Sequence, residues 1–376
     1  MTTLKLCYVG PAASVTTRRW VEWFARRGHD TTVLTVEPAA AEVSGQFRQI
    51  DVGVRRGPRK VGRLWSAMRL ARTVRTLRPD VVHVHYARGL AWGLTLLRPH
   101  PCVVTPWGSD VLADQGAFRE CYSRWLTRRL LGSADVVTVH SSYMEAQVRP
   151  LLSSSTGPLV RIGWGVDRTR FRPGLEVRPL REKWGISRAE RVIFSARLAQ
   201  PLYRHDRIIR ALPIIREKVS SALVVIPQQS AAPGYIDSLR RLAGDLGVCD
   251  AVRFIPSIPY AEMPLWLNLA DVVVMVPESD GMPNTLWEAM ACGAAPVLNR
   301  LPQYAGVVRH GVNGCLVDPD GDLAGAVTGL LLDMDLRSMM ASRNAALVRE
   351  QGDQDREMAR MEEWYYALAA AKTRAR

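Results

Sequence analysis

The 376-residue chain lacks several features that mark particular protein classes. It has no run of 18 consecutive apolar residues, so no membrane-spanning helix is expected. Its first apolar segment, Leu4 to Gly10, is too short and too interrupted for the core of a secretion signal. The six cysteines form no C-x-x-C pair, and Cys7, Cys102 and Cys315 lie in apolar, strand-like runs. We therefore expect a cytoplasmic protein whose thiols are free and buried.

Lysine is scarce, and one long stretch contains no acidic residue. Only five of the 50 basic residues are lysine. Residues 1–160 hold 22 basic against 11 acidic residues, so +11 of the net charge of +14 lies there. Between Asp51 and Asp80 the charged residues are Arg55, Arg56, Arg59, Lys60, Arg63, Arg69, Arg72, Arg75 and Arg78. Such a basic face attracts anionic lipid, nucleic acid or acidic substrates, or is only solvated.

The later part of this basic stretch has the pattern of an amphipathic helix. Its expected apolar side consists of Leu64, Trp65, Met68, Leu70, Ala71, Val74 and Leu77. The last helix, around residues 356–370, carries Met358, Met361, Trp364, Tyr365 and Leu368 at helical spacing, which predicts packing rather than chemistry.

The length and the alternation of apolar runs predict two α/β domains. Strands are expected at residues 4–9, 31–36, 81–85, 102–105, 136–139 and 159–162, and then at 192–196, 223–226, 252–255, 272–276, 295–298 and 315–317. The turn-rich segment from Gly165 to Gly174 reads as the linker. We therefore predict domains over 1–164 and 165–352, with a C-terminal helix, 353–376, that packs back onto the first.

A strand, a loop and a helix are expected between residues 271 and 293. Val272 to Val276 is a continuous β-branched run of the kind found in strands buried on both faces. Pro283 suits the first helical position, because its missing N–H costs nothing there. The expected helix then shows an apolar face of Leu286, Trp287 and Met290.

Two carboxylates, Asp280 and Glu288, flank the start of this expected helix. The unpaired amides and the positive end of the dipole there attract a phosphate. Carboxylate oxygens only accept hydrogen bonds, which suits the hydroxyl groups of a ribose or a hexose. Glu288 lies about 200° around the helix from Leu286, so its carboxylate should point away from the core. The pattern predicts a nucleotide-sugar site; alternatively, Asp280 only caps the helix and Glu288 is solvated.

Several motifs together resemble the retaining glycosyltransferases of family 4. They are Arg26-Arg27-Gly28-His29-Asp30, Pro79-Asp80-Val81-Val82-His83-Val84-His85, Gly165-Val166-Asp167 with Phe171 and Pro173, the family's E-x7-E element with Asp280 in its first place, and His310-Gly311-Val312-Asn313-Gly314. The resemblance covers nearly the whole chain. It implies the GT-B fold, in which two doubly wound parallel-sheet (Rossmann-like) domains face a cleft. It also implies that the N-terminal domain binds the acceptor and the C-terminal domain binds the donor.

The resemblance implies site residues position by position. Glu288 would bind the ribose hydroxyls, and Arg197 would neutralise the diphosphate leaving group unless it is only a surface salt-bridge residue. Asp280 would hold the donor sugar and phosphates together with the backbone of Gly281, Met282, Pro283 and Asn284. No metal and no cofactor is implied, since an arginine and helix amides would stabilise the leaving diphosphate in place of a metal ion. No protein nucleophile is implied either, because the leaving phosphate oxygen helps to deprotonate the acceptor in a front-face displacement.

The chain departs from the family pattern at several places. The family lysine after Arg197 is absent, and Arg204 is the nearest cation for the phosphates. The usual Gly-rich turn near Ile226 to Gln229 lacks glycine. The sequence from Trp107 to Asp110 is similar to a W-G-S-D variant of the family, so both residues become acceptor-site candidates, while Asp110 could equally cap the next helix.

Three further residues lie on strands of the first expected sheet. Gly10, at the end of the first strand, would let a substrate approach closely. His83 and His85 alternate along a strand with valines, and we expect both to be structural residues.

The resemblance predicts a metal-independent, retaining glycosyltransferase of glycan, polysaccharide or glycolipid biosynthesis. Its partners would be a nucleotide-diphosphate sugar and a sugar, lipid-linked or anionic acceptor, without nucleic acid. The basic stretch Arg55 to Arg78 adds an anionic membrane surface on the cytoplasmic side. The alternatives are a nucleotide-sugar epimerase of the same fold, a non-catalytic nucleotide-sugar-binding module and a phosphorylase. The last would need pyridoxal phosphate and a lysine in a site motif, which the sequence does not offer.

Overall fold

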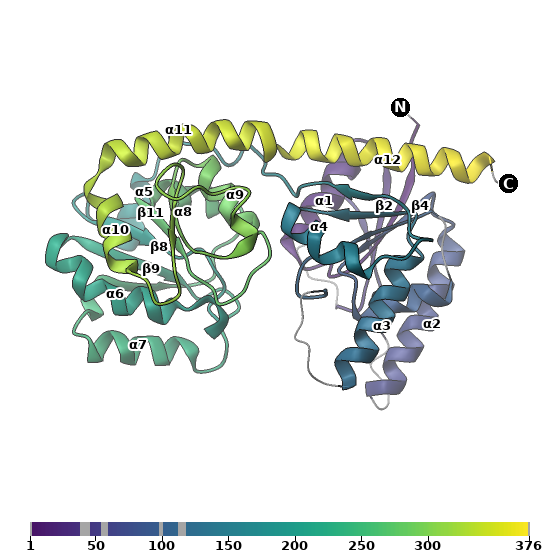
Figure 1. The fold of residues 1–376 in the computed structure, drawn as a ribbon, viewed down its shortest axis with the longest axis horizontal. Helices are drawn as coiled ribbons and strands as arrows, with labels where there is room; N and C mark the ends of the chain where they lie inside the picture. The colour runs from purple at the N-terminus through teal and green to yellow at the C-terminus, as the bar shows by residue number, and fades with distance from the viewer. Residues whose placement is uncertain (1, 38–45, 54–58, 98–100, 112–117, 375–376) are drawn as a thin grey trace. The chain divides into compact units, whose positions relative to one another are not determined.

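The computed structural model describes residues 2–37, 46–53, 59–97, 101–111 and 118–374. Contacts divide the chain into two units (Figure 1). Unit 1 comprises residues 1–164 and 355–376, and unit 2 comprises residues 165–354. Arg55 and Arg56 of the basic stretch lie outside the described residues.

Unit 1 is built on a seven-stranded sheet with the order β3-β2-β1-β4-β5-β6-β7, in which every pair is parallel. The strands are β1 (Lys5–Val9), β2 (Asp30–Thr35), β3 (Arg48–Asp51), β4 (Val81–His85), β5 (Cys102–Thr105), β6 (Val136–Val139) and β7 (Leu159–Arg161). The helices are α1 (Val15–Arg26), α2 (Arg59–Leu77), η1 (Gly89–Leu96), α3 (Phe118–Gly132), α4 (Ser142–Val148), η2 (Arg149–Leu151) and, from Asp355 onward, α12 (Gln354–Arg374).

Unit 2 contains a six-stranded parallel sheet with the order β10-β9-β8-β11-β12-β13. Its strands are β8 (Arg191–Phe194), β9 (Ala222–Pro227), β10 (Val252–Ile255), β11 (Val272–Met275), β12 (Ala295–Asn299) and β13 (Cys315–Val317). Its helices are α5 (Arg178–Trp184), η3 (Pro201–Tyr203), α6 (His205–Lys218), α7 (Tyr235–Asp245), η4 (Cys249–Ala251), α8 (Met263–Leu269), α9 (Asn284–Ala291), η5 (Pro302–Tyr304), α10 (Leu323–Leu332) and α11 (Met334–Gln351).

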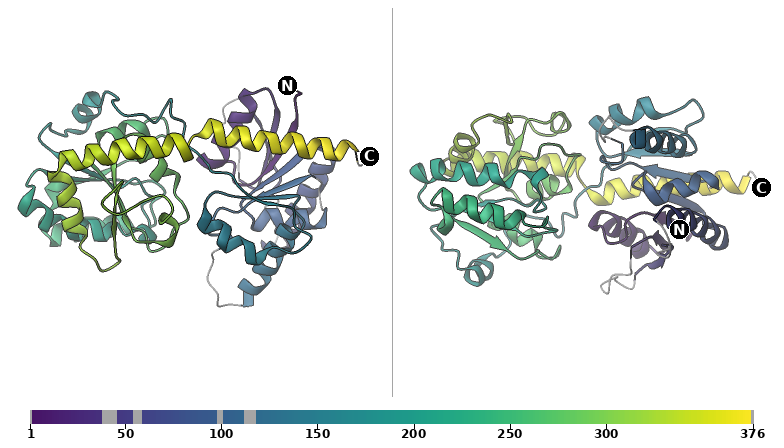
Figure 2. Two further views of the ribbon diagram at one scale, coloured as in Figure 1. Left: turned by 45° about the horizontal axis from the view of Figure 1, so that its top comes forward. Right: turned by 90° about the horizontal axis from the view of Figure 1, so that it is seen from below.

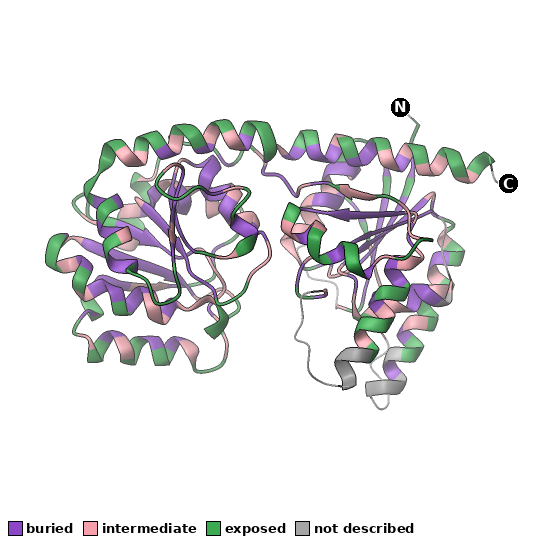
Figure 3. Cartoon of the chain, in the orientation of Figure 1, coloured by how far each residue is buried: buried purple, intermediate pink, exposed green. Residues whose placement is uncertain are grey.

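The predicted strands are present with small shifts at their ends, and apart from β7, whose residues are partly or fully exposed, they are mostly buried apolar runs of the chain (Figure 3). The sequence analysis missed β3, whose residues Arg48-Gln49-Ile50-Asp51 form an edge strand and are all at least partly exposed. Edge strands need not be apolar, so hydrophobic runs do not reveal them. Among the described cysteines, Cys249 is exposed, which corrects the expectation that the thiols are buried.

The predicted apolar side of α2 is wrong for three residues. Leu70 and Val74 are buried, whereas Leu64, Trp65 and Met68 are about half exposed. The buried face of the first turns is instead formed by the small residues Gly62 and Ser66, four positions apart. The larger apolar side chains of these turns therefore face outward.

The C-terminal helix α12 closes unit 1, and it lies along this unit in each view (Figures 1 and 2). Met358, Met361 and Tyr365 are fully buried in the core beside α1. Arg27 Nε and His29 Nε2 both lie 2.9 Å from Glu362 Oε1. In the described part of the chain, no helix combines the length and the apolar character needed to cross a membrane.

Candidate functional site

Both sheets have a topological switch point, where successive crossovers leave in opposite directions. It lies between β1 and β4 in unit 1 and between β8 and β11 in unit 2. In open parallel sheets, ligands bind outside the carboxyl ends of the strands at such a point. Gly10, Arg197 and Asp280 follow the switch-point strands β1, β8 and β11, whereas Trp107 and Asp110 follow the adjacent strand β5.

In unit 2, Arg197 follows β8 and Asp280 follows β11, and their side chains form an ion pair. Arg197 Nη2 lies 2.8 Å from Asp280 Oδ2, and each side chain is only 12% exposed. The guanidinium also stacks on the ring of Tyr203, 4.5 Å from its centroid. Its Nε–H is buried and has no hydrogen-bond partner. A buried donor of this kind is a group that a phosphate oxygen can satisfy.

Burial and pairing act in opposite directions on this ion pair. Burial disfavours the charge on Arg197, but the Asp280 carboxylate together with Tyr203 and Tyr304 more than offsets it, so the pKa of Arg197 is raised. Burial also raises the pKa of Asp280, and the Arg197 charge and the Gly281 N–H bond offset this only in part. The guanidinium is thus held as a permanent positive charge inside unit 2.

Hydrogen bonds fix the loop that carries Asp280. The Gly281 N–H donates to Asp280 Oδ1 at 2.8 Å, and the Tyr304 hydroxyl donates to Oδ2 at 3.5 Å. The Asp280 carbonyl accepts from Gln303 Nε2 at 2.8 Å. Asn299, at the end of β12, donates to the Pro277 carbonyl at 2.7 Å. The loop is therefore braced from the neighbouring strand before any ligand arrives.

Helix α9 follows this loop and begins one residue later than predicted. Pro283 is extended (φ −70°, ψ 134°) and precedes the first helical residue, Asn284. Glu288 is more buried than the helical-wheel argument predicted, with only 4% of its surface exposed. The Tyr260 hydroxyl donates to Glu288 Oε1 at 2.8 Å. Met282 is also buried, within the core of unit 2, so only its backbone can meet a ligand.

Arg204 is held by carboxylates. Its guanidinium lies 3.0 Å from Asp206 Oδ1 and 3.2 Å from Glu278 Oε1. Its backbone has a left-handed φ of 50° just before α6. The Glu278 N–H donates to the Leu202 carbonyl at 3.0 Å. Arg204 thus ties the segment before α6 to the loop that carries Asp280.

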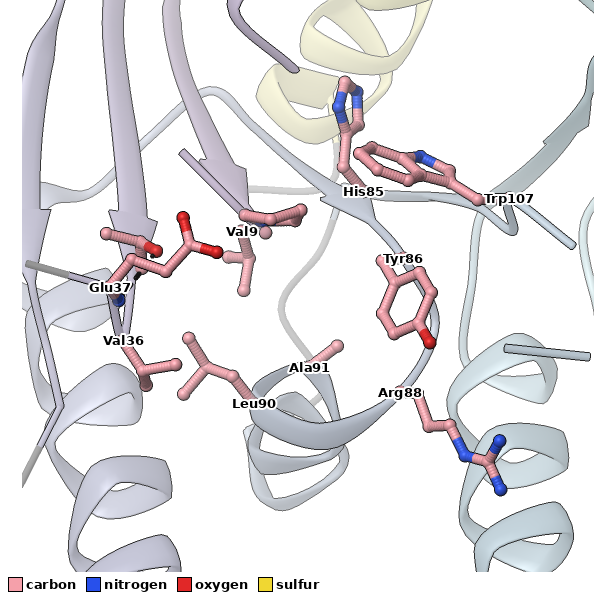
Figure 4. Close-up of a pocket in the computed structure, with 12 residues that line it drawn as sticks. Val9, Val36, Glu37, His85, Tyr86, Arg88, Leu90, Ala91 and Trp107 are labelled. Carbon is pink, nitrogen blue, oxygen red and sulfur yellow. Dashed lines mark hydrogen bonds between the residues drawn. The ribbon is translucent and has the colours of Figure 1, made fainter. Parts of the chain in front are cut away.

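In unit 1 a pocket of about 290 Å³ lies at the switch point (Figure 4). Its wall is mostly apolar, and Glu37, Tyr86 and Arg88 add polar groups. Glu37 Oε2 accepts a hydrogen bond from the Ala13 N–H at 2.9 Å. Trp107 also lines the pocket, and its buried Nε1–H has no hydrogen-bond partner. The pocket has the size and composition of a small-molecule site.

Gly10 lines this pocket, and the structure shows why a larger residue does not fit at this position. A Cβ at Gly10 would lie 2.6 Å from the His85 carbonyl oxygen, which is closer than real Cβ contacts. Gly10 therefore lets β1 end beside β4, while its predicted role in letting a substrate approach closely stays a prediction.

Asp110 holds two of the loops that line the pocket. It is 4% exposed, and its carboxylate accepts from the N–H groups of Ala87 at 2.6 Å, Trp107 at 2.9 Å and Gly108 at 2.8 Å. Its oxygens are thus engaged by backbone that precedes it and by the loop after β4. This arrangement positions two pocket loops. Its predicted contact with an acceptor, and its alternative as the N-cap of the next segment, whose residues 112–117 lie outside the described ones, stay predictions.

The two histidines of β4 are buried, as expected for structural residues. His83 bonds to Tyr365 of α12, and its Nε2 lies 2.6 Å from Thr105 Oγ1. Burial lowers the pKa of His85 to about 3, so its ring is neutral, and neither ring nitrogen has a hydrogen-bond partner. Tyr203 and Tyr260 contact the key charges of unit 2, but no pattern in the sequence marks them.

Comparisons with known proteins show the family of the chain. Residues 12–165 match the glycosyl transferase 4-like domain, and residues 177–346 match the glycosyl transferases group 1. The chain is 31% identical over 281 residues to a GDP-mannose-dependent alpha-(1-6)-phosphatidylinositol monomannoside mannosyltransferase from Mycobacterium tuberculosis, covering 70% of each protein. It is 34% identical over 223 residues to D-inositol 3-phosphate glycosyltransferase 2 from Catenulispora acidiphila, covering 54% of this chain and 51% of that one.

Solved structures show the same fold. Sucrose-phosphate synthase from Thermosynechococcus elongatus superposes with a TM-score of 0.81 at 19% identity, over 97% of this chain and 99% of that one. HepE from Anabaena, in complex with UDP and glucose, superposes with a TM-score of 0.80 at 16% identity, over 97% and 100% of the two chains. The fold is therefore GT-B. The chain belongs to the group 1 glycosyltransferases of family 4 and is a nucleotide-sugar-dependent glycosyltransferase.

Proposed function

We propose that this enzyme binds its nucleotide-sugar donor in unit 2 and transfers the sugar, with retention, to an anionic or lipid-linked acceptor bound in unit 1. The observation that carries the proposal is the buried pair of Arg197 and Asp280 at the switch point of the second sheet. An arginine whose Nε–H has no partner suits a diphosphate, and an acceptor-only carboxylate beside it suits a sugar hydroxyl.

Each donor group has a matching side chain in unit 2. Arg197 would take the diphosphate, together with the amides at the start of α9. Asp280 would then turn from Arg197 to a sugar hydroxyl. Glu288, fixed by Tyr260, would accept from the ribose hydroxyls. The Arg204 guanidinium is already paired with two carboxylates. We therefore propose that Arg204 braces the loop that carries Asp280 and attracts the phosphates by its charge without contacting them.

The positive groups of this site suggest how the leaving group is stabilised. As the bond between sugar and phosphate breaks, charge builds on the diphosphate, next to Arg197 and the helix amides. We propose that these groups, without a metal ion, carry that charge. The departing phosphate oxygen takes the proton of the acceptor hydroxyl, whose oxygen attacks the same face of the sugar, so the anomeric configuration is retained.

The acceptor assignment rests on unit 1. Its pocket combines apolar walls with Tyr86, Arg88 and Glu37, and residues 1–160 carry a charge of +11. The two relatives named above act on a phosphatidylinositol mannoside and an inositol phosphate, both of which are anionic. We propose an acceptor of this charge, at the cytoplasmic face of a membrane.

A thermal-shift screen against UDP-, GDP-, ADP- and TDP-sugars tests the donor part, with GDP-mannose first because of the mycobacterial relative. The expected result is a clear stabilisation by one nucleotide class that Arg197→Ala and Glu288→Ala remove. Transfer is then measured with phosphatidylinositol and inositol phosphate as acceptors, with and without EDTA, and the product anomer is read by NMR. Loss of transfer in EDTA, or an inverted anomer, would refute the proposed mechanism.

A further inference from the structure

One buried histidine of unit 2 has no role in the site described so far. His205 is the first residue of α6 and is fully buried. Neither of its ring nitrogens has a hydrogen-bond partner among the described residues. A neutral imidazole carries one donor and one acceptor, and leaving both unsatisfied in a protein interior costs free energy. A ring in this state points to a partner outside the polypeptide.

His205 lies at the ligand-binding edge of the second sheet. It begins the helix that follows β8, a strand of the switch point, so it lies near the carboxyl end of that strand. Two residues earlier, the ring of Tyr203 stacks with the Arg197 guanidinium at 4.5 Å. The charge and the carbonyl group of Arg197 both act on the His205 ring, although the ring and the carbonyl do not form a hydrogen bond. The ring is therefore a neighbour of the buried cation of unit 2.

Three groups that titrate or carry charge face the His205 ring. Arg197, after β8, disfavours protonation, and Asp206 of α6, which lies 3.0 Å from Arg204, favours it. From α7, the Tyr235 ring lies edge-on with its centroid 6.0 Å away, and the Tyr235 hydroxyl accepts from the His205 N–H at 3.2 Å. Burial and the Arg197 charge outweigh Asp206 and lower the pKa of His205 to about 4. The ring is thus neutral in the free protein.

A diphosphate at Arg197 would reverse this balance. An anion within about 4–6 Å favours the protonated form of a titrating group by about 10- to 1,000-fold. The protonated ring would then donate from both nitrogens. A second permanent cation beside the buried Arg197 would be costly in the free protein, whereas a histidine takes its charge only when the anion is present.

We propose that His205 is a second, titratable cation of the donor site, which takes up a proton from solvent when the diphosphate binds and releases it when the nucleoside diphosphate leaves. The inference rests on the proposed function, because that function places the diphosphate at Arg197. The protonated ring adds positive charge where the leaving group develops its negative charge. A histidine that only packs against Tyr235 would stay neutral throughout.

The pH dependence of donor affinity tests the proposal in the full-length protein. The probe is the nucleotide sugar that stabilises the wild type most in the thermal-shift screen, because it has no monoester phosphate and keeps its charge over the range used. Its Kd is measured by isothermal titration between about pH 7.5 and about pH 5. With a free pKa of about 4 and protonation favoured about 100-fold by the anion, Kd should be about tenfold lower at the acidic end. Titrations in two buffers of different ionisation enthalpy should also show proton uptake.

Two substitutions remove the titrating group and keep a polar side chain. In His205→Gln and His205→Asn, the Kd should no longer fall toward low pH, and the proton uptake should disappear. His140→Gln is the matched control, because His140 is also buried, has no partner at either ring nitrogen and has a pKa lowered to about 4, but belongs to unit 1. It should keep the wild-type pH dependence. Asp280→Asn controls for the carboxyl group of the site, whose pKa burial raises, and should keep this dependence as well.

Donor binding separates a failure of this inference from a failure of the proposed function. A pH-independent Kd, or no proton uptake by the wild type, would overturn the role of His205 whether or not the variants fold, and would leave the proposed function standing. A pH dependence that persists in the His205 variants and disappears in Asp280→Asn would assign the proton to Asp280 and make His205 structural. If no nucleotide sugar binds at any pH, the proposed function fails and this inference fails with it.

Discussion

The pair of Arg197 and Asp280 gives a prediction with two separable readouts. Arg197→Gln removes the positive charge but keeps a polar side chain. It leaves the Asp280 carboxylate buried without its partner, which costs about 3–5 kcal/mol of unfolding free energy. Because each side chain keeps 12% exposure, we expect the lower end, about 3 kcal/mol. Loss of one preorganised donor to the leaving group should also reduce kcat by about 10²–10³.

The double variant Arg197→Gln with Asp280→Asn divides these effects. Two neutral amides need no counter-charge, so most of the lost stability should return, while activity should stay low. Stability is measured by urea denaturation and activity by release of the nucleoside diphosphate. Arg204→Gln is the control, and we expect it to lower kcat/KM less than about tenfold, since the Arg204 guanidinium is engaged by carboxylates. Near wild-type kcat/KM in Arg197→Gln, or no recovery of stability in the double variant, would refute the reasoning.

Three further predictions concern the supporting residues. Tyr260→Phe removes the hydrogen bond that the Tyr260 hydroxyl donates to the buried Glu288. Such a bond is worth about 1.5–3 kcal/mol, so the KM for the nucleotide sugar should rise by about 10- to 150-fold. An unchanged KM would contradict this. Burial lowers the pKa of His140 to about 4, so its contribution to stability is complete above pH 6.5 and is lost as the pH falls toward 4. His140→Phe should therefore flatten urea-derived stability against pH by up to about 1.4 kcal/mol per unit in that window, and an unchanged slope would count against it. Gly10→Ala should destabilise the protein by about 1–3 kcal/mol in thermal unfolding, since its Cβ meets the His85 carbonyl, and a neutral result would show that β1 and β4 can separate.

Most strands were predictable because they are buried apolar runs, whereas the edge strand β3 and the outward-facing turns of α2 were not. Periodicity assumes that the largest apolar residues face the core. In α2 the small residues Gly62 and Ser66 are buried instead, and Leu64 and Trp65 remain exposed. Close packing of small residues is a tertiary effect that the pattern of one helix does not contain.

The candidate site was predictable where one side chain follows one strand. Arg197 and Asp280 follow β8 and β11, and these strands are neighbours, so their meeting is a consequence of strand order. Tyr260 reaches Glu288 from the segment before α8, and nothing local marks it. The bracing role of Asp110 was not predicted, because the N–H groups that it accepts from belong to loops whose conformation only the structure reveals.

Isothermal titration tests the central claim most directly. The nucleoside diphosphate whose sugar stabilises the wild type most in the thermal-shift screen is titrated into the wild type, Arg197→Gln and Glu288→Gln. Loss of a charge-assisted hydrogen bond to a buried ligand costs about 1.5–3 kcal/mol, so each variant should raise Kd by about 10- to 150-fold. Equal Kd values in all three proteins would contradict the placement of the donor at the switch point of the second sheet.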